Sequence, residues 1–140
     1  MTWFVYALLS AFFGALTAIL AKIGIKNVDS NLATAIRTVV ILFFAWGIVL
    51  SQGTIKQLST ISQFSLLFLI LSGIATGLSW LFYFHALQLG QASRVSPIDK
   101  LSLVITIVLA IVFLKEKVTP PILIGAVLMS VGAILVGFGG

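Results

Sequence analysis

The chain has 140 residues, of which 61% are hydrophobic and 8% are charged, and its formal net charge is +5. A soluble domain carries about 25% charged residues, so the composition excludes an ordinary soluble domain and predicts a protein that lipid solvates. The positive charges lie scattered at the ends of apolar stretches, which argues against nucleic-acid binding. The chain has no cysteine, so disulfides and thiolate metal sites are excluded as well.

Five apolar stretches follow one another along the chain, and we interpret each as a membrane-spanning helix. They cover residues 2–21, 31–50, 64–89, 98–114 and 121–138. A helix needs about 20 apolar residues to cross a hydrocarbon core that is ~30 Å thick. The fourth stretch covers only about 25 Å, so it spans either if its ends lie slightly inside the hydrocarbon core or if the bilayer thins locally. Spanning strands would be shorter and would alternate in polarity. The sequence therefore predicts an all-α integral membrane protein with one domain over residues 1–140.

The first and last stretches each present a face of small residues at helical spacings of three and four. Membrane helices pack through such faces, because lipid removes the hydrophobic drive for association. We expect close packing there, either within the chain or between chains. Thr119, which two prolines follow, is the expected N-cap of the last helix. The small residues are Ala7, Ala11, Gly14, Ala18 and Ala21 in the first stretch and Ala126, Ser130, Ala133 and Gly137 in the last.

The second, third and fourth stretches each carry a polar stripe on one helical face. Polar side chains that face lipid would be wasteful, so we expect the stripes to face the protein interior. There they either hydrogen-bond to neighbouring helices or line a water-filled cavity, and the hydroxyl groups alone leave both possibilities open. The stripes are Thr34, Arg37 and Thr38; Ser72, Thr76, Ser79 and Tyr83; and Asp99, Ser102 and Thr106.

Ionisable side chains within the spans are candidates for function, because each costs roughly 2.5–3.5 kcal/mol at the centre of a membrane helix. Arg37 is the strongest candidate, and we expect it to pair with Asp99 near the same membrane face. Lys22 closes the first helix on that face, and its alternative role is to snorkel to the lipid headgroups. Asp99 also has a structural alternative: with Ser96 as N-cap and Pro97 as the first helical residue, it would complete a capping arrangement.

His85 is the single histidine of the chain. Such a residue is more often an interfacial or interhelical hydrogen-bonding group than a proton carrier, and the sequence leaves both roles open. Glu116 belongs to the polar turn Lys115–Lys117, for which we expect a structural role. We expect no metal site, because no second histidine or cysteine is present. The sequence contains no Ser-His-Asp arrangement or phosphate-binding loop, so we expect neither an enzyme nor a cofactor.

The charges orient the chain only weakly. Five spans place the termini on opposite faces of the membrane, and the cations in the loops are balanced three to three. Arg37 and Lys100 lie within helix ends. If they are counted, the N-terminal face has three cations and the other face has five. Under the positive-inside rule, both a single orientation and insertion in both orientations stay open. The loop cations are Lys56, Lys115 and Lys117 on the N-terminal face and Lys22, Lys26 and Arg94 on the other.

Several runs of residues are similar to those of one transporter family. The most specific is Ser96–Ser102, which matches the signature at the start of that family's fourth helix. The others are residues 21–24, 33–38, 77–83, 114–117 and 125–126. Through these runs the chain resembles, over nearly its whole length, the five-helix EamA-domain members of the drug/metabolite transporter superfamily. His85 departs from the pattern, since a basic Arg or Lys is expected there.

The resemblance implies a multi-pass protein of a prokaryotic inner membrane that is half of a ten-helix transporter with inverted repeats. It implies an antiparallel homodimer that carries a small polar metabolite, often outward, by alternating access. The solute site would lie between the halves near the bilayer midplane, lined by Lys22 and the three polar stripes. The excess of cations at the helix ends favours an anionic or zwitterionic solute. The alternative function is a non-transporting membrane subunit that scaffolds or regulates a partner, and its polar stripes would be dry. The substrate, the direction and the energy coupling stay open.

Overall fold

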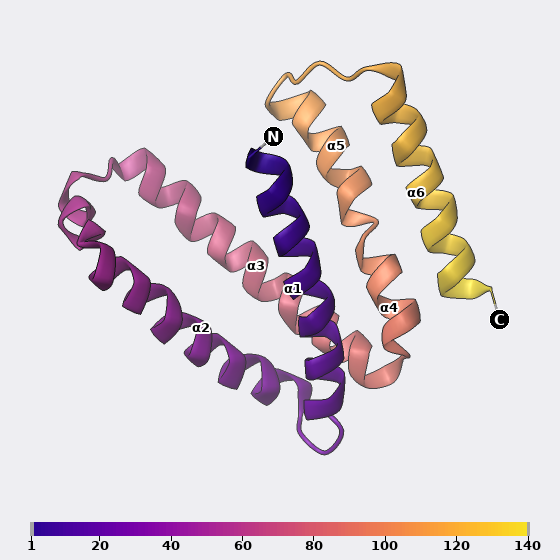
Figure 1. Ribbon diagram of the computed structural model, residues 1–140, viewed down its shortest axis with the longest axis horizontal. Helices are drawn as coiled ribbons and strands as arrows, with labels where there is room; N and C mark the ends of the chain where they lie inside the picture. Colours follow the sequence, from indigo (N-terminus) through magenta and orange to yellow (C-terminus); the bar gives the residue numbers. More distant parts are fainter. Residues whose placement is uncertain (1, 140) are drawn as a thin grey trace. The chain divides into compact units, whose positions relative to one another are not determined.

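Helices make up most of the computed structural model, which describes residues 2–139 (Figure 1). These residues contain no β-strand, so the predicted all-α fold is confirmed. The elements are α1 (Thr2–Gly24), α2 (Ser30–Gln52), the 3₁₀ helix η1 (Thr54–Thr60), α3 (Gln63–Leu89), α4 (Ala92–Asp99), α5 (Ser102–Phe113) and α6 (Pro120–Phe138).

Five helical segments of the described chain are long and apolar enough to cross a membrane. Four of them are the single helices α1, α2, α3 and α6, and the remaining one is Ala92–Phe113, which combines α4 and α5. Large apolar side chains lie exposed along the spans; the exposed fractions of Phe43 and Phe82 are 73% and 74%. A water-soluble monomer rarely exposes so large an apolar surface, whereas lipid solvates it. The chain is therefore a multi-pass membrane protein, as predicted.

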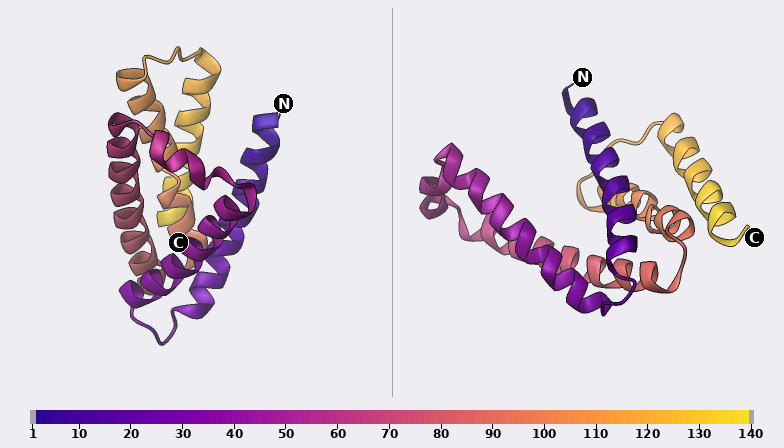
Figure 2. Two further views of the ribbon diagram at one scale, coloured as in Figure 1. Left: turned by 90° about the vertical axis from the view of Figure 1, so that its left-hand side faces the viewer. Right: turned by 60° about the horizontal axis from the view of Figure 1, so that its bottom comes forward.

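The chain divides into two compact units. One combines α1 up to Lys22 with the chain from Leu89 onward, and the other is Ile23–Gln88. The second unit is a helical hairpin, in which η1 joins α2 to α3 (Figure 2). Because α2 and α3 run in opposite directions, the first residues of α2 and the last residues of α3 belong to the same end of the hairpin.

Local capping explains where α2 begins and ends. The carboxylate of Asp29 accepts hydrogen bonds from the backbone N–H groups of Asn31 and Leu32, both at 3.0 Å. These bonds satisfy two of the backbone donors that the start of a helix leaves unpaired. At the other end, Gly53 has φ +70° and its N–H donates to the Leu50 carbonyl at 3.3 Å. A residue without a side chain adopts this left-handed conformation without steric cost, so it ends the helix.

The fourth span begins at Ala92, six residues before the predicted start, and is interrupted at Lys100 and Leu101. The prediction that Ser96 caps this helix and that Pro97 is its first residue is therefore wrong, because Pro97 lies inside α4. The polar character of residues 92–96 hid the start of the helix, which forms where α4 packs against α6. At the interruption, the N–H of Leu101 donates to the Ile98 carbonyl at 3.0 Å, a tight turn of the 3₁₀ type.

A polar turn joins α5 to α6. Lys115 has φ +54°, and the N–H of Glu116 donates to the Ala110 carbonyl at 3.2 Å, which closes the end of α5. Thr119 precedes α6 at the N-cap position and the two prolines that follow occupy its first turn, although the threonine hydroxyl accepts no cap hydrogen bond. The predicted position of Thr119 at the start of the last helix is confirmed, and the structural role of the turn stays a prediction.

Helix α6 packs against α4 and α5 through the small-residue face that the sequence predicts. Ala126 and Ala133 are buried, and Gly137 lies directly against Ile98 of α4. A Cβ atom placed on Gly137 would lie 2.5 Å from the Ile98 Cδ1 atom, so a larger residue at this position would require the Ile98 side chain to move. In α1, by contrast, only Ala18 and Ala21 of the predicted face are buried.

Candidate functional site

Arg37 of α2 points its guanidinium group at two aromatic rings of α3. The guanidinium carbon lies 4.1 Å from the centroid of the Phe84 ring and 5.4 Å from that of the Trp80 ring. The spacing of four residues places both rings on one face of α3. A cation over an aromatic face gains about 2 kcal/mol or more when water is excluded. The rings therefore explain how the hairpin holds a charged side chain within its membrane span.

The Arg37 guanidinium is not satisfied by this contact. Its Nη1 atom is buried and has no hydrogen-bond partner among the residues of its own unit, Ile23–Gln88. An aromatic face attracts the positive charge but leaves the in-plane N–H donors of the guanidinium without an acceptor. Arg37 and Asp99 belong to different compact units, and their pairing stays a prediction.

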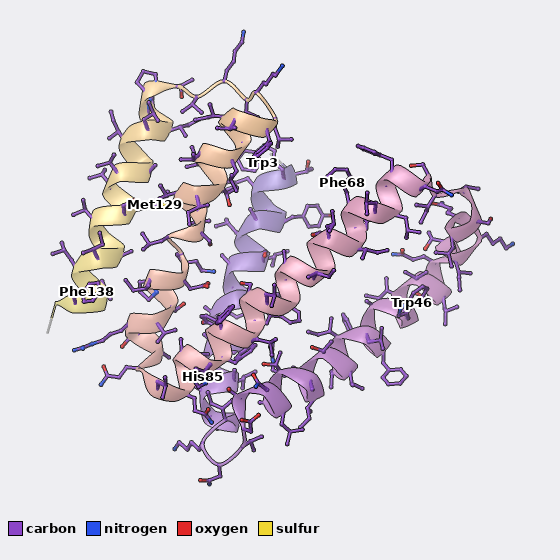
Figure 3. The ribbon with its side chains drawn as sticks, turned by 180° about the vertical axis from the view of Figure 1, so that it is seen from behind. Trp3, Trp46, Phe68, His85, Met129 and Phe138 are labelled. Carbon is purple, nitrogen blue, oxygen red and sulfur yellow. The ribbon has the colours of Figure 1, made fainter. Side chains whose placement is uncertain are left out.

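His85 lies near the end of α3, beside the first residues of α2 (Figure 3). Its Nδ1 atom lies 3.2 Å from the hydroxyl oxygen of Ser30, which is 2% exposed. Which of the two donates depends on the tautomer of the imidazole. The structure thus shows a hydrogen bond between two helices at His85, and a role of His85 in proton transfer stays untested.

The two threonines of the α2 stripe hydrogen-bond within their own helix. Thr34 donates to the Ser30 carbonyl at 2.9 Å, and Thr38 donates to the Thr34 carbonyl at 2.8 Å. Thr34 is buried. These bonds satisfy both hydroxyl donors and leave Arg37 as the side chain of this stripe with unused hydrogen-bonding capacity.

Gln88 links the end of α3 to the segment before α2 by hydrogen bonds. Its amide nitrogen donates to the Val28 carbonyl at 2.7 Å and to the Ile25 carbonyl at 3.3 Å. Two carbonyl groups outside regular helix thereby gain a donor, which matters where water is scarce. Together with the bond between His85 and Ser30, this contact closes one end of the hairpin around Arg37.

The polar stripe of α3 lies outside this closed end. Ser72, Thr76 and Ser79 are exposed, and Tyr83 is half-buried beside Phe84. Thr76 donates to the Ser72 carbonyl at 2.9 Å. Its own unit therefore leaves this stripe uncovered, and its place along a cavity stays a prediction.

In the other unit, Lys22 closes α1 and is half-buried. Its Nζ atom donates to the Gly90 carbonyl at 2.6 Å, in the turn just before α4. This specific bond links two segments that are far apart in the sequence. Sequence reasoning expected Lys22 either at a headgroup or in a functional site, and did not indicate a backbone carbonyl as a partner.

Asp99 is the last residue of α4 and is half-buried. The predicted position in the first turn of the helix, where a carboxylate complements the helix dipole, is wrong, because α4 begins seven residues earlier at Ala92. Ser102 and Thr106 are exposed on α5, and the threonine hydroxyl donates to the Ser102 carbonyl at 2.7 Å.

The predicted site residues divide between the two units. The hairpin contains the α2 and α3 stripes, whereas Lys22, Asp99, Ser102 and Thr106 lie in the other unit. Sequence reasoning missed Ser30, Trp80, Phe84 and Gln88. The spacing of Trp80 and Phe84 was the one signal that could have indicated an aromatic face. Among residues 2–139, no three His, Cys, Asp or Glu side chains form a group that could hold a metal ion.

Comparison with known proteins places the chain among transporters. The model of the EamA-like transporter family matches residues 1–138. An uncharacterised transporter from the cobO 3′ region of a Sinorhizobium species is 48% identical over 134 residues, which are 96% of this chain and 95% of that protein. An uncharacterised protein of Methanocaldococcus jannaschii is 38% identical over 80 residues, which are 57% of this chain and 58% of that protein. No solved structure matches the chain.

Proposed function

Because the chain belongs to the EamA-like transporter family, we propose that it carries a small polar solute across the membrane by alternating access as a homodimer of antiparallel copies. The observation that carries this proposal is the match of the family to residues 1–138 of a chain with five candidate spans. The Sinorhizobium relative, which is named a transporter, supports the same function.

Two features of the chain support the antiparallel pair. Five spans place the two termini on opposite sides of the membrane, and the eight cations at the span ends and in the connections divide only five to three between the sides. In transporters with inverted repeats, the solute site lies between two halves of opposite orientation near the bilayer midplane. Two copies of this chain in opposite orientations would supply those halves without a second domain.

Solute flux through purified protein tests the transport function. Vesicles of phosphatidylcholine with and without the reconstituted full chain are loaded with a mixture of small metabolites, and mass spectrometry follows the contents and the outer medium. We expect at least one polar metabolite to leave the protein-containing vesicles faster than the empty ones. Equal rates for every metabolite, in both directions, would contradict transport and favour a membrane subunit that supports another protein.

A further inference from the structure

Arg37 keeps unused hydrogen-bonding capacity inside a membrane span. Its Nη1 atom is buried and has no hydrogen-bond partner within its own unit, Ile23–Gln88. The rings of Phe84 and Trp80 lie at 4.1 and 5.4 Å from the guanidinium carbon and hold the cation by its face. The N–H donors of a guanidinium lie in its plane and form a rigid fork. The aromatic contact therefore positions the fork but leaves it without an acceptor.

The unit that contains Arg37 supplies no carboxylate for this fork. Between Ile23 and Gln88 the sequence has a single acidic side chain, Asp29. Its carboxylate already accepts two backbone N–H groups as the cap of α2. It also lies about 12 Å further along the helix axis, at 1.5 Å per residue. A cation inside a membrane is costly unless it meets an acceptor or an opposite charge.

We propose that the Arg37 guanidinium, held by Trp80 and Phe84, binds the oxyanion group of the transported solute, which is a carboxylate or a phosphate. This inference rests on the proposed transport function and adds the chemical class of the solute. The guanidinium fork matches both oxyanions with two parallel hydrogen bonds. An oxyanion that leaves water needs such a charged donor. The solute thereby gains a positive counter-charge, and Arg37 gains a hydrogen-bond acceptor, which the hairpin does not supply.

Trp80 gives a direct optical readout of binding at Arg37. The other tryptophans, Trp3 and Trp46, are exposed and are replaced by phenylalanine, so that the tryptophan fluorescence comes from Trp80 alone. The full chain in nanodiscs of phosphatidylcholine is titrated with succinate, with inorganic phosphate and with neutral succinamide. We expect a saturable change in Trp80 fluorescence with at least one oxyanion and none with succinamide. An equal response to succinamide, or no saturable response to either oxyanion, overturns the inference.

Substitution of Arg37 tests the assignment of the donor. Arg37→Gln should weaken oxyanion binding by about 10- to 100-fold, because a hydrogen bond to a charged group is lost. Lys26→Gln is the matched control, since it removes one positive charge from an exposed position of the same unit, and we expect it to keep the original affinity. Unchanged affinity in Arg37→Gln overturns the inference.

A second substitution keeps the test decisive if Arg37→Gln does not fold. Arg37→Lys preserves the charge but removes the planar fork, so we expect a loss of affinity smaller than that of Arg37→Gln. Circular dichroism and size-exclusion chromatography check that each variant folds. An affinity of Arg37→Lys within about twofold of the original overturns recognition by the guanidinium fork.

A lipid headgroup carries the same oxyanion chemistry as a free solute. The titrations are therefore repeated in nanodiscs that contain phosphatidylglycerol. We expect the emission of Trp80 without solute and the affinity for the oxyanion to be the same in both lipids. A shift in emission caused by phosphatidylglycerol, together with loss of the response to solute, assigns Arg37 to a lipid headgroup and overturns its role in solute binding.

The flux assay separates this inference from the proposed function. Flux of a metabolite that is undiminished in Arg37→Gln vesicles overturns the role of Arg37 while transport stands. Saturable binding of an oxyanion at Trp80 without flux of any metabolite supports the binding site and contradicts transport. Flux of an oxyanion that Arg37→Gln reduces supports both.

Discussion

At the scale of single residues, a few polar side chains make the contacts that link distant segments of the described chain. Lys22 donates a hydrogen bond to the Gly90 carbonyl at 2.6 Å, and Gln88 donates one to the Val28 carbonyl at 2.7 Å. The side chains of His85 and Ser30 form a hydrogen bond at 3.2 Å. Each contact joins residues more than fifty positions apart in the sequence. Where water is excluded, an unpaired polar group costs more than it does in solution, so these few bonds select how the segments pair.

The bond between Ser30 and His85 should contribute measurably to stability. Ser30→Ala removes the hydroxyl at a position that is 2% exposed and leaves His85 Nδ1 without its partner. We expect the free energy of unfolding to fall by about 1 kcal/mol, measured by titration with sodium dodecyl sulfate in mixed micelles. Ser59→Ala is the control, because that exposed hydroxyl bonds only within its own turn. Equal effects of the two substitutions would contradict the predicted contribution.

At the scale of helices, the fourth span differs from the other four. It is interrupted between α4 and α5, and both parts pack against α6. Interrupted membrane helices are tolerated where protein covers their irregular backbone. Here the N–H groups of Lys100 and Leu101 find carbonyl partners within the preceding turn, at 3.1 and 3.0 Å. Asp99 ends α4 directly before this interruption, which places its carboxylate where the backbone departs from a regular helix.

The close contact between α4 and α6 depends on the absence of a side chain at Gly137. A Cβ atom there would lie 2.5 Å from Ile98 Cδ1, so we expect Gly137→Leu to destabilise the protein by about 1–3 kcal/mol through overpacking. Gly132→Leu is the control, since a Cβ on Gly132 meets nothing within 4 Å. Ile98→Ala should partly restore the Gly137→Leu variant in the same unfolding titration. Equal stability of the two leucine variants would refute the close contact.

The α3 stripe can be tested by cysteine labelling, because the natural chain has no cysteine. We expect cysteines at Ser72, Thr76 and Ser79 to react with a membrane-impermeant maleimide in reconstituted protein, since a solute pathway is hydrated. Cysteines at Ile70 and Ile74, on the opposite face of the helix, should stay protected by lipid. Equal protection of both faces would remove the water-filled cavity, and only a packing role for the stripe would survive.

At the scale of the whole molecule, the five spans expose long rows of apolar side chains. Lipid covers such surfaces, and contact with a second copy covers part of them in a transporter with paired halves. The eight cations of the chain divide only five to three between the two sides. A chain with so weak a charge bias has little to select one orientation, which suits a pair built from one sequence.

The antiparallel pair predicts that a C-terminal topology reporter shows both orientations in one population of the protein. Replacing Gln52 and Gln57 by lysine should bias insertion. The added charges fall at the last residue of α2 and in η1, and positive charges at this end of the hairpin favour its location on the cytoplasmic side. We expect this variant to lose most of its transport and to regain it when co-expressed with a variant of the opposite bias. A single orientation of the natural chain with intact transport would rule out the antiparallel pair.

The sequence by itself determined the five spans, the absence of an ordinary soluble domain and the choice of Arg37 as an unusual charge within a span. These properties are local, because the requirement that lipid imposes on each helix is met by the length and composition of that helix alone. Only the tertiary structure decided that the Arg37 guanidinium lies over the rings of Phe84 and Trp80. The same holds for the hydrogen bond between Ser30 and His85. It also decided that α4 begins at Ala92. Partners of this kind depend on which faces two distant helices turn toward each other, and in lipid that choice follows from packing and a few hydrogen bonds rather than from hydrophobic pattern.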